Sequence, residues 1–260
     1  MKEGSKKLRL VFLVFIALFI VNLVVPLIGF SSHTQRLWVI SSVTIAVLSV
    51  LILIKEKLPG KDTIALGLVL AFLVGLIRPF TGVVTFLAFL ASMRIMGKAD
   101  DGVVILRRPY SLSIFLGVGV GLVLGFINLF LAGVQMKFVP SFYAFVLSLN
   151  PGISEEVIYR LFMYAFSIYL LGGRISTRKE AVWLYVLVIV PHVLLHFPDS
   201  YFVNGSLHLD LGMLLVSPVL LALLFGLPMT LAMLKRDLAS AMLIHTIVDF
   251  IRFIFLGLPF

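Results

Sequence analysis

Seven ionisable side chains stand out because their types and spacing suit acid–base chemistry. They form three short motifs inside long apolar runs: Glu155, Glu156 and Arg160; His192 and His196; and His245 and Asp249. Carboxylates and imidazoles exchange protons with water and orient one another. Ionisable groups at membrane depth are costly unless they are paired, hydrated or turned inward. The three motifs are therefore expected to converge on one hydrated cavity.

The first motif predicts one paired and one free carboxylate. Glu156 and Arg160 are four residues apart, which puts them on one helix face in the favourable order for an ion pair. Glu155 is rotated by about 100° from Glu156 on a helix, so the same arginine cannot easily neutralise both. Pro151 and Gly152, just upstream, predict a bend or a restart of the helix, with Ser154 as the N-cap.

The two histidine motifs also repeat at a spacing of four. This spacing puts His192 and His196 on one helix face. Zinc proteases with that spacing carry a glutamate directly after the first histidine, where this chain has Val193, so the helix is not of that type. In the last motif, Asp249 can fix the tautomer and orientation of His245.

Composition indicates the solvent in which these motifs lie. Hydrophobic residues make up 61% of the chain and charged residues 13%, whereas soluble domains are about half apolar and about a quarter charged. Runs such as 10–30 and 111–134 are continuously apolar and suit spans of roughly 20 residues rather than alternating barrel strands. The fold class predicted is an all-α, polytopic transmembrane helical bundle.

The hydropathy pattern predicts eight or nine crossings, because segments 63–77 and 79–93 are short and could form a re-entrant hairpin. The candidate spans are 10–30, 37–54, 63–77, 79–93, 111–134, 142–171, 181–198, 209–234 and 239–257. We expect one membrane domain over residues 1–260. Its N-terminal spans, 1–110, carry few ionisable groups, and a catalytic core at 140–255 forms the polar cavity.

The charge pattern predicts the orientation. The net charge is +9, but sixteen of the 21 basic residues fall on one side if every span crosses, against three on the other side. This asymmetry predicts a cytoplasmic N-terminus in a multi-pass protein, expected in a prokaryotic plasma membrane, and it argues against nucleic acid as a partner. The absence of cysteine excludes a thiolate nucleophile.

Several aromatic and charged residues are assigned to the membrane surface. Trp38, Trp183 and Tyr185 suit interfacial belts. Arg252, near the end of the last span, is expected to extend its side chain toward the interface. His33, His208 and Asp210 are interpreted as polar loop residues.

The three motifs together resemble the type II CAAX prenyl endopeptidase family of glutamate-dependent intramembrane proteases, which includes bacteriocin-processing and immunity proteins. That family carries a double glutamate with an arginine after three further residues, then phenylalanine or histidine with histidine four residues on, then histidine with asparagine or aspartate four residues on. All three patterns occur here in order, over roughly residues 140–255. Leu161 replaces a commonly small residue, and Asp249 stands where the prenyl-protein enzymes have asparagine.

The resemblance implies a role for most of these residues. Glu155 and His196 would activate water, and His245, helped by Asp249, would stabilise the oxyanion. The supporting residues are Glu156, Arg160 and His192, of which His192 has no definite role. No cofactor is required, although a divalent metal such as zinc stays open, and its ligands would be Glu155, Glu156, His196 and His245.

The function expected is that of an intramembrane endopeptidase that cleaves a hydrophobic or prenylated peptide C-terminus. Its partners would be membrane lipids and a hydrophobic or lipidated peptide, and the oligomeric state stays open. One alternative is a noncatalytic membrane scaffold or bacteriocin-immunity-type protein with the same fold. Another is a proton-coupled transporter, which inverted repeats would favour, and the sequence shows none.

Overall fold

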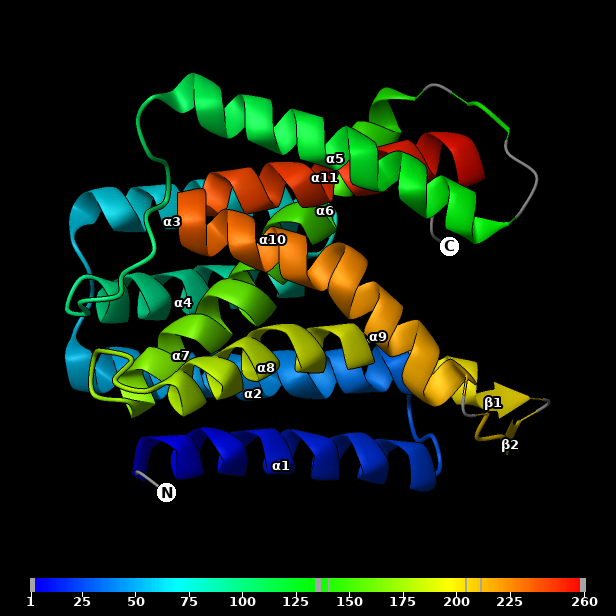
Figure 1. Ribbon diagram of the computed structural model, residues 1–260, viewed down its shortest axis with the longest axis horizontal. Coiled ribbons are helices and arrows are strands. Elements are labelled where there is room, and N and C mark those ends of the chain that lie inside the picture. The colour runs from blue at the N-terminus through cyan, green and yellow to red at the C-terminus, as the bar shows by residue number, and fades with distance from the viewer. Residues whose placement is uncertain (1–2, 134–136, 140, 204, 211, 258–260) are drawn as a thin grey trace.

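The computed structural model describes residues 3–133, 137–139, 141–203, 205–210 and 212–257. Within them the chain forms nine helical rods that run largely along one direction (Figure 1). The first five rods are α1 (Glu3–Val24), α2 (His33–Glu56), α3 (Lys61–Gly75), α4 (Pro79–Met96) and α5 (Tyr110–Ala132). This arrangement confirms the predicted fold class, a helical membrane bundle.

The C-terminal half contains four rods, two of which change their helical winding. The sixth rod joins α6 (Phe142–Glu155), the π-helix η1 (Glu156–Leu161) and α7 (Phe162–Leu170), and it is followed by α8 (Arg178–Leu194). The eighth rod contains η3 (Gly212–Val216), α9 (Ser217–Leu221), η4 (Ala222–Gly226), α10 (Leu227–Leu231) and η5 (Ala232–Arg236). The last is α11 (Leu238–Leu256). A 3₁₀ turn, η2 (Pro198–Tyr201), and a small hairpin of β1 (Phe202–Val203) and β2 (Ser206–Leu207) precede the eighth rod.

Every predicted span coincides with a helix over most of its length. Six helices of the described chain are long and apolar enough to cross a membrane: α1, α2, α4, α5, the rod 212–236 and α11. The first helix lies nearer the N-terminus than the predicted span 10–30, since α1 begins at Glu3 and ends at Val24. The predicted boundary at residue 134 lies outside the described residues. The short α3 packs along α4 as a hairpin (Figure 1), and the number of crossings stays a prediction.

The predicted restart at Ser154 is wrong. The sixth rod begins at Phe142, where the Ser141 Oγ accepts a hydrogen bond from the Ala144 N–H at 3.4 Å. Ser154 is buried inside the helix, and its hydroxyl donates to the Asn150 carbonyl at 2.7 Å. Proline removes one helical hydrogen bond but need not end a helix that its neighbours hold in place. The rod therefore continues through Pro151 into the π-helix η1.

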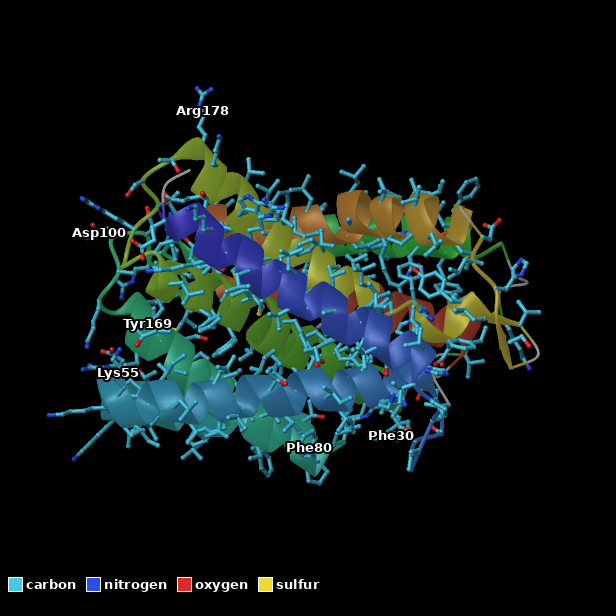
Figure 2. The ribbon with its side chains drawn as sticks, turned by 90° about the horizontal axis from the view of Figure 1, so that it is seen from below. Phe30, Lys55, Phe80, Asp100, Tyr169 and Arg178 are labelled. Atoms are coloured by element: carbon cyan, nitrogen blue, oxygen red, sulfur yellow. The ribbon has the colours of Figure 1, made fainter. Side chains whose placement is uncertain are left out.

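Loops from different parts of the chain meet at one end of the bundle. There the Lys98 ammonium lies 2.5 Å from the Glu56 carboxylate, and the Asp100 N–H donates to the Gly173 carbonyl at 3.1 Å. Figure 2 shows Lys55 and Asp100 at this end, with Phe30 far from it. The basic loops at 55–61, 94–108 and 174–179 therefore share one face, as their sequence pattern predicts.

A buried carboxylate, Asp237, holds the loop before α5 against the start of α11. It accepts hydrogen bonds from the Ser240 N–H at 2.8 Å, the Ser113 hydroxyl at 2.5 Å and the Arg107 N–H at 3.0 Å. Burial opposes ionisation, but these hydrogen bonds outweigh it, so the pKa of Asp237 is lowered from its ordinary value. The charged carboxylate is therefore the form that the fold favours.

Close backbone contacts fix the position of α11. A Cβ atom added to Gly117, Gly121 or Gly125 of α5 would lie within 2.5–2.8 Å of side-chain atoms of α11. A Cβ atom on Gly152 of α6 would lie 2.9 Å from the backbone nitrogen of Thr246. Glycine at these positions lets both helices approach α11 closely, and the approach places His245 beside the glutamates of the sixth rod.

Candidate active site

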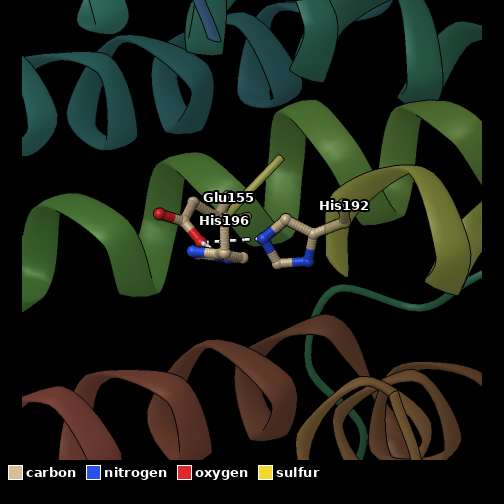
Figure 3. Close-up of side chains that lie close together, drawn as sticks. All are labelled: Glu155, His192 and His196. Atoms are coloured by element: carbon tan, nitrogen blue, oxygen red, sulfur yellow. Dashed lines mark hydrogen bonds and ion pairs between the residues drawn. The ribbon is translucent and has the colours of Figure 1, made fainter. Parts of the chain in front are cut away.

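Three elements bring the predicted residues together in the interior of the bundle. Glu155 is the last residue of α6, and its Oε2 atom faces His192 and His196, at and just beyond the end of α8 (Figure 3). The same atom also faces a histidine of α11. This oxygen lies 2.7 Å from His192 Nε2, 3.7 Å from His245 Nε2 and 3.9 Å from His196 Nε2. The predicted convergence of the three motifs is therefore present in the fold.

The contacts of His192 define its tautomer. Its Nδ1 atom lies 3.2 Å from an Arg160 guanidinium nitrogen, and its Nε2 atom lies 2.7 Å from the Glu155 carboxylate. Because arginine can only donate, Nδ1 must accept, so Nε2 carries the proton that is donated to Glu155. His192, which had no definite role in the sequence, links Arg160 to the carboxylate of Glu155.

Glu156 lies in a sealed part of the site. Its side chain is fully buried and forms an ion pair with Arg160, which confirms the pairing predicted from their spacing. The same carboxylate oxygen, Oε1, lies 2.7 Å from His245 Nδ1. Neither Glu156 Oε2 nor Arg160 Nε has a hydrogen-bond partner among the described protein atoms. Glu156 thus holds Arg160 and His245 and does not reach the cavity.

Asp249 lies near His245 but does not hold its ring by a hydrogen bond. The distance from Asp249 Oδ2 to His245 Nε2 is 3.5 Å, longer than a typical N–H···O bond. The hydrogen bond that orients the imidazole comes from Glu156, on the opposite ring nitrogen. Asp249 therefore acts on His245 mainly through its proximity and its charge.

His196 is the most open member of the cluster. It follows the C-cap residue Leu195, and 41% of its side-chain surface is exposed, against 15% for Glu155. The separation of 3.9 Å between His196 Nε2 and Glu155 Oε2 is too long for a direct hydrogen bond. A water molecule at the cavity surface can contact both groups.

An aromatic wall from α2 and η1 covers the histidines, and the sequence did not reveal it. The Trp38 ring lies edge-on to His196 at 5.4 Å and to His192 at 6.0 Å between ring centroids. Tyr159 lies parallel to His192 at 5.8 Å, and its hydroxyl shares a hydrogen bond of 2.7 Å with Ser42. Trp38 is thus not confined to an interfacial belt. The one available signal was the serines that follow it in an apolar span.

The cluster opens on a cavity of about 320 Å³. One wall is polar and includes Arg160, His192, His196, His245 and Asp249. The facing wall comes from the rod 212–236 and is apolar, with Leu221, Phe225, Gly226 and Met229. Asn128 of α5 and Arg252 of α11 also line this space. A cavity with one apolar and one acid–base wall suits a hydrophobic ligand with a polar reacting group.

Distances alone allow a metal ion at this site. Within the described chain, donor atoms of Glu155, His192 and His196 lie within 4.8 Å of one another and could hold a metal ion. The set differs from the ligands expected from the sequence, because it contains His192 and leaves out Glu156 and His245. His192 could ligate through Nε2 only as the tautomer protonated on Nδ1, to which Arg160 cannot donate. Metal binding by His192 and its hydrogen bond from Arg160 are therefore mutually exclusive.

The fold and the site define a helical membrane protein with an acid–base centre buried between its spans. The family model described as Type II CAAX prenyl endopeptidase Rce1-like matches residues 137–251. The matched segment, less than half of the chain, is similar to that family, which confirms the resemblance seen in the three motifs. No curated protein and no solved structure matches the chain. All seven motif residues lie inside the matched segment, whereas Trp38, Asn128 and Arg252 lie outside it.

Proposed function

We propose that this protein is an intramembrane endopeptidase that hydrolyses a hydrophobic or prenylated peptide near its C-terminus. One observation carries the proposal: a single carboxylate oxygen, Oε2 of Glu155, faces three histidines at the edge of a cavity between the spans. The Rce1-like match supports a protease-like function for the family, and the proposal extends it to turnover by these residues.

Glu155 is the proposed general base, acting with His196. A water molecule bound between the two gives a proton to Glu155 while its oxygen attacks the carbonyl carbon of the peptide. The proton then passes to the amide nitrogen as the carbon–nitrogen bond breaks, which releases an amine and a carboxylic acid. The hydrogen bond from His192 aims Oε2, which keeps a second lone pair to take the proton.

His245 is the proposed stabiliser of the tetrahedral oxyanion. If Nδ1 donates its proton to Glu156, Nε2 carries a proton only in the imidazolium form, and that form can donate to the oxyanion. Glu156 and Arg160 support this role by holding the ring from the buried side. Asp249, 3.5 Å from Nε2, favours a positive charge at that position.

Zinc chemistry at the same site is the alternative mechanism. A bound ion would supply an activated water and polarise the carbonyl oxygen. We favour the route without a resident metal, because the hydrogen bonding of His192 occupies both of its ring nitrogens. Zinc analysis of purified protein, chelation and add-back test this choice. Stoichiometric zinc together with chelator-sensitive activity would refute the metal-free mechanism.

Substrate and location are also part of the proposal. The apolar wall of Leu221, Phe225 and Met229 favours a hydrophobic or lipidated peptide that arrives from the surrounding lipid, and no nucleic acid is expected as a partner. The gathering of basic loops at one end supports a cytoplasmic N-terminus, in a prokaryotic plasma membrane. Accessibility of N-terminal tags to protease in intact cells and in inverted vesicles tests this orientation.

The decisive experiment is a cleavage assay with the full-length protein in lipid vesicles. Prenylated and unmodified apolar peptides are incubated with the wild type and with Glu155→Gln, and mass spectrometry identifies the products. We expect defined cleavage by the wild type alone. Peptide binding without cleavage by the wild type would contradict the enzymatic proposal and favour a noncatalytic scaffold of the same fold.

A further inference from the structure

A carboxylate outside the cavity joins the turn after His196 to the start of α2. Asp199 lies in η2, three residues beyond His196. Its two carboxylate oxygens accept hydrogen bonds from the main-chain N–H groups of His33 and Thr34, at 2.8 and 3.3 Å. The Thr34 hydroxyl accepts a hydrogen bond from the Asp199 N–H at 3.2 Å in return. Three hydrogen bonds thus join two segments that are about 165 residues apart in the chain.

Asp199 acts as a second cap for α2. The first N–H groups of a helix have no acceptor within it. Ser32, the N-cap of α2, accepts a hydrogen bond from the Gln35 N–H at 3.0 Å, and Asp199 serves the two N–H groups in between. Beside this contact, the His33 ring stacks on Phe202 at 4.0 Å between ring centroids. A cap that comes from another segment fixes the position of that segment as well as the end of the helix.

The position of His196 depends on such support, because the regular helix has already ended. The helix α8 ends at Leu194, and the His196 N–H donates to the Val193 carbonyl at 3.2 Å in a tighter turn. The exposed ring must nevertheless stay near its present 3.9 Å from Glu155 if one water molecule is to contact both groups. The turn that follows His196 therefore governs where its ring lies.

The helix α2 contacts both the ring of His196 and the turn that follows it. Trp38 lies four residues after Thr34, on the same face of α2, and its ring is edge-on to His196 at 5.4 Å. We propose that Asp199 is a positioning residue for His196. By holding the turn against the start of α2, it keeps the His196 ring at a distance from Glu155 that one water molecule bridges. Asp199 does not belong to the described residues that line the cavity, so it acts through His196. Its effect on turnover rests on the proposed endopeptidase function.

Turnover of the best peptide in vesicles measures this role. Asp199→Ala should lower kcat about fivefold, the size expected for a net loss of one hydrogen bond, and should leave KM nearly unchanged because the cavity walls stay intact. Asp199→Asn keeps one accepting oxygen and should lose less activity. Asp62→Ala, the matched control, removes an exposed carboxylate from the first turn of α3 and should not change kcat. An Asp199→Ala protein with the kcat of the wild type would overturn the proposal.

A double-mutant cycle separates positioning from general destabilisation. In His196→Ala the ring that Asp199 positions is absent, so adding Asp199→Ala should leave the residual kcat unchanged. Thr34→Val removes the acceptor of the Asp199 N–H alone and should lower kcat about twofold, again only when His196 is present. An equal loss of kcat from Asp199→Ala with and without His196 would show that the substitution destabilises the bundle, and would refute the positioning role.

Fluorescence separates this inference from the proposed function. In a Trp183→Phe background Trp38 is the one tryptophan left, and an imidazole in contact with its ring quenches its emission. His196→Ala should therefore change the emission, and the change should be smaller when Asp199→Ala is also present. A smaller change, without cleavage by the wild type, supports the positioning role and refutes the enzyme. An equal change in both proteins, with cleavage by the wild type, supports the enzyme and refutes the positioning role.

Discussion

The two glutamates of the first motif are neighbours in the chain but lie in regions of opposite character. The sealed region contains Glu156, which is fully buried and paired with Arg160, and the Nδ1 side of His245; the buried Arg160 connects it to the wall of the cavity. The open region contains Glu155, whose side chain is 15% exposed and whose Oε2 atom lies 3.9 Å from His196, a residue that lines the cavity. A rotation of about 100° between consecutive helical residues is enough to separate a structural carboxylate from a chemical one.

This difference shows how a membrane site can keep an unpaired carboxylate. Burying a charge is costly unless it is paired, and Arg160 is committed to Glu156. Glu155 instead receives hydrogen bonding from His192, which Arg160 orients on its other side. The sealed region thereby stabilises the open one through His192. Substitution by glutamine should therefore lower activity at Glu155 and stability at Glu156.

The largest expected effect is on activity, in the open region. Glu155→Gln removes the proposed base and should lower kcat by about 10³-fold, within the range for general-base catalysis. Its thermal midpoint in detergent should stay close to that of the wild type. Turnover is measured with the best peptide of the vesicle assay. Retained turnover in this variant would show that the open region is not the chemical one.

The next effect is on stability, in the sealed region. Glu156→Gln leaves Arg160 buried without its counter-charge and should cost about 3–5 kcal/mol of stability. Combining it with Arg160→Met removes both charges and should restore much of the loss, as measured by detergent denaturation. If the single variant is as stable as the wild type, the assignment of Glu156 as a structural residue is wrong.

A smaller effect is expected where α2 borders the open region. Trp38→Leu removes the ring that packs edge-on against His196 and His192, and should lower kcat about tenfold by loosening the histidines. Trp38→Phe should recover most of this loss of kcat, and its dependence of kcat on pH should match that of the wild type. Trp183→Leu, which removes the other tryptophan of the chain, serves as the control. Equal effects of Trp38→Leu and Trp183→Leu would indicate general destabilisation instead.

The smallest effect concerns a carboxylate outside the spans. The lowered pKa of Asp237 means that its charged form stabilises the fold above its ordinary pKa of about 4, and that this contribution is lost as the pH falls through the native value. Asp237→Asn should cost about 1 kcal/mol near neutral pH. The difference in free energy of unfolding between this variant and the wild type should shrink below about pH 4, as measured by denaturation curves. A difference that does not change with pH would show that the charge of Asp237 does not stabilise the fold.

The sequence predicted the parts that depend on local spacing. Long apolar runs predicted the helices, and a spacing of four predicted the Glu156–Arg160 pair, because both follow from helix geometry alone. The spacing also predicted that Glu156 pairs with Arg160 and that Glu155 does not. What failed locally was Pro151, which was expected to restart the helix. Packing against α11 and the π-helical winding of η1 keep the rod continuous, and neither can be read from spacing.

Contacts between distant segments could not be predicted. Trp38 reaches His196 across more than 150 residues of chain, and the choice of Glu156 over Asp249 as the partner of His245 depends on the angle at which α11 crosses the sixth rod. The role of His192 likewise required the position of Arg160 relative to its ring. Such relations arise from tertiary packing, which the hydropathy pattern does not encode.

The contact of Gly152 with Thr246 has a consequence for precision. Gly152 precedes Glu155 by three residues, and Thr246 directly follows His245, so main-chain atoms set the gap between the two helices at the reacting groups. Distances set by main chain vary less than those set by rotatable side chains. The proposed base and oxyanion donor are thus held at a fixed separation before any ligand arrives. Adding a single methyl group at Gly152 would force the two helices apart and change this separation.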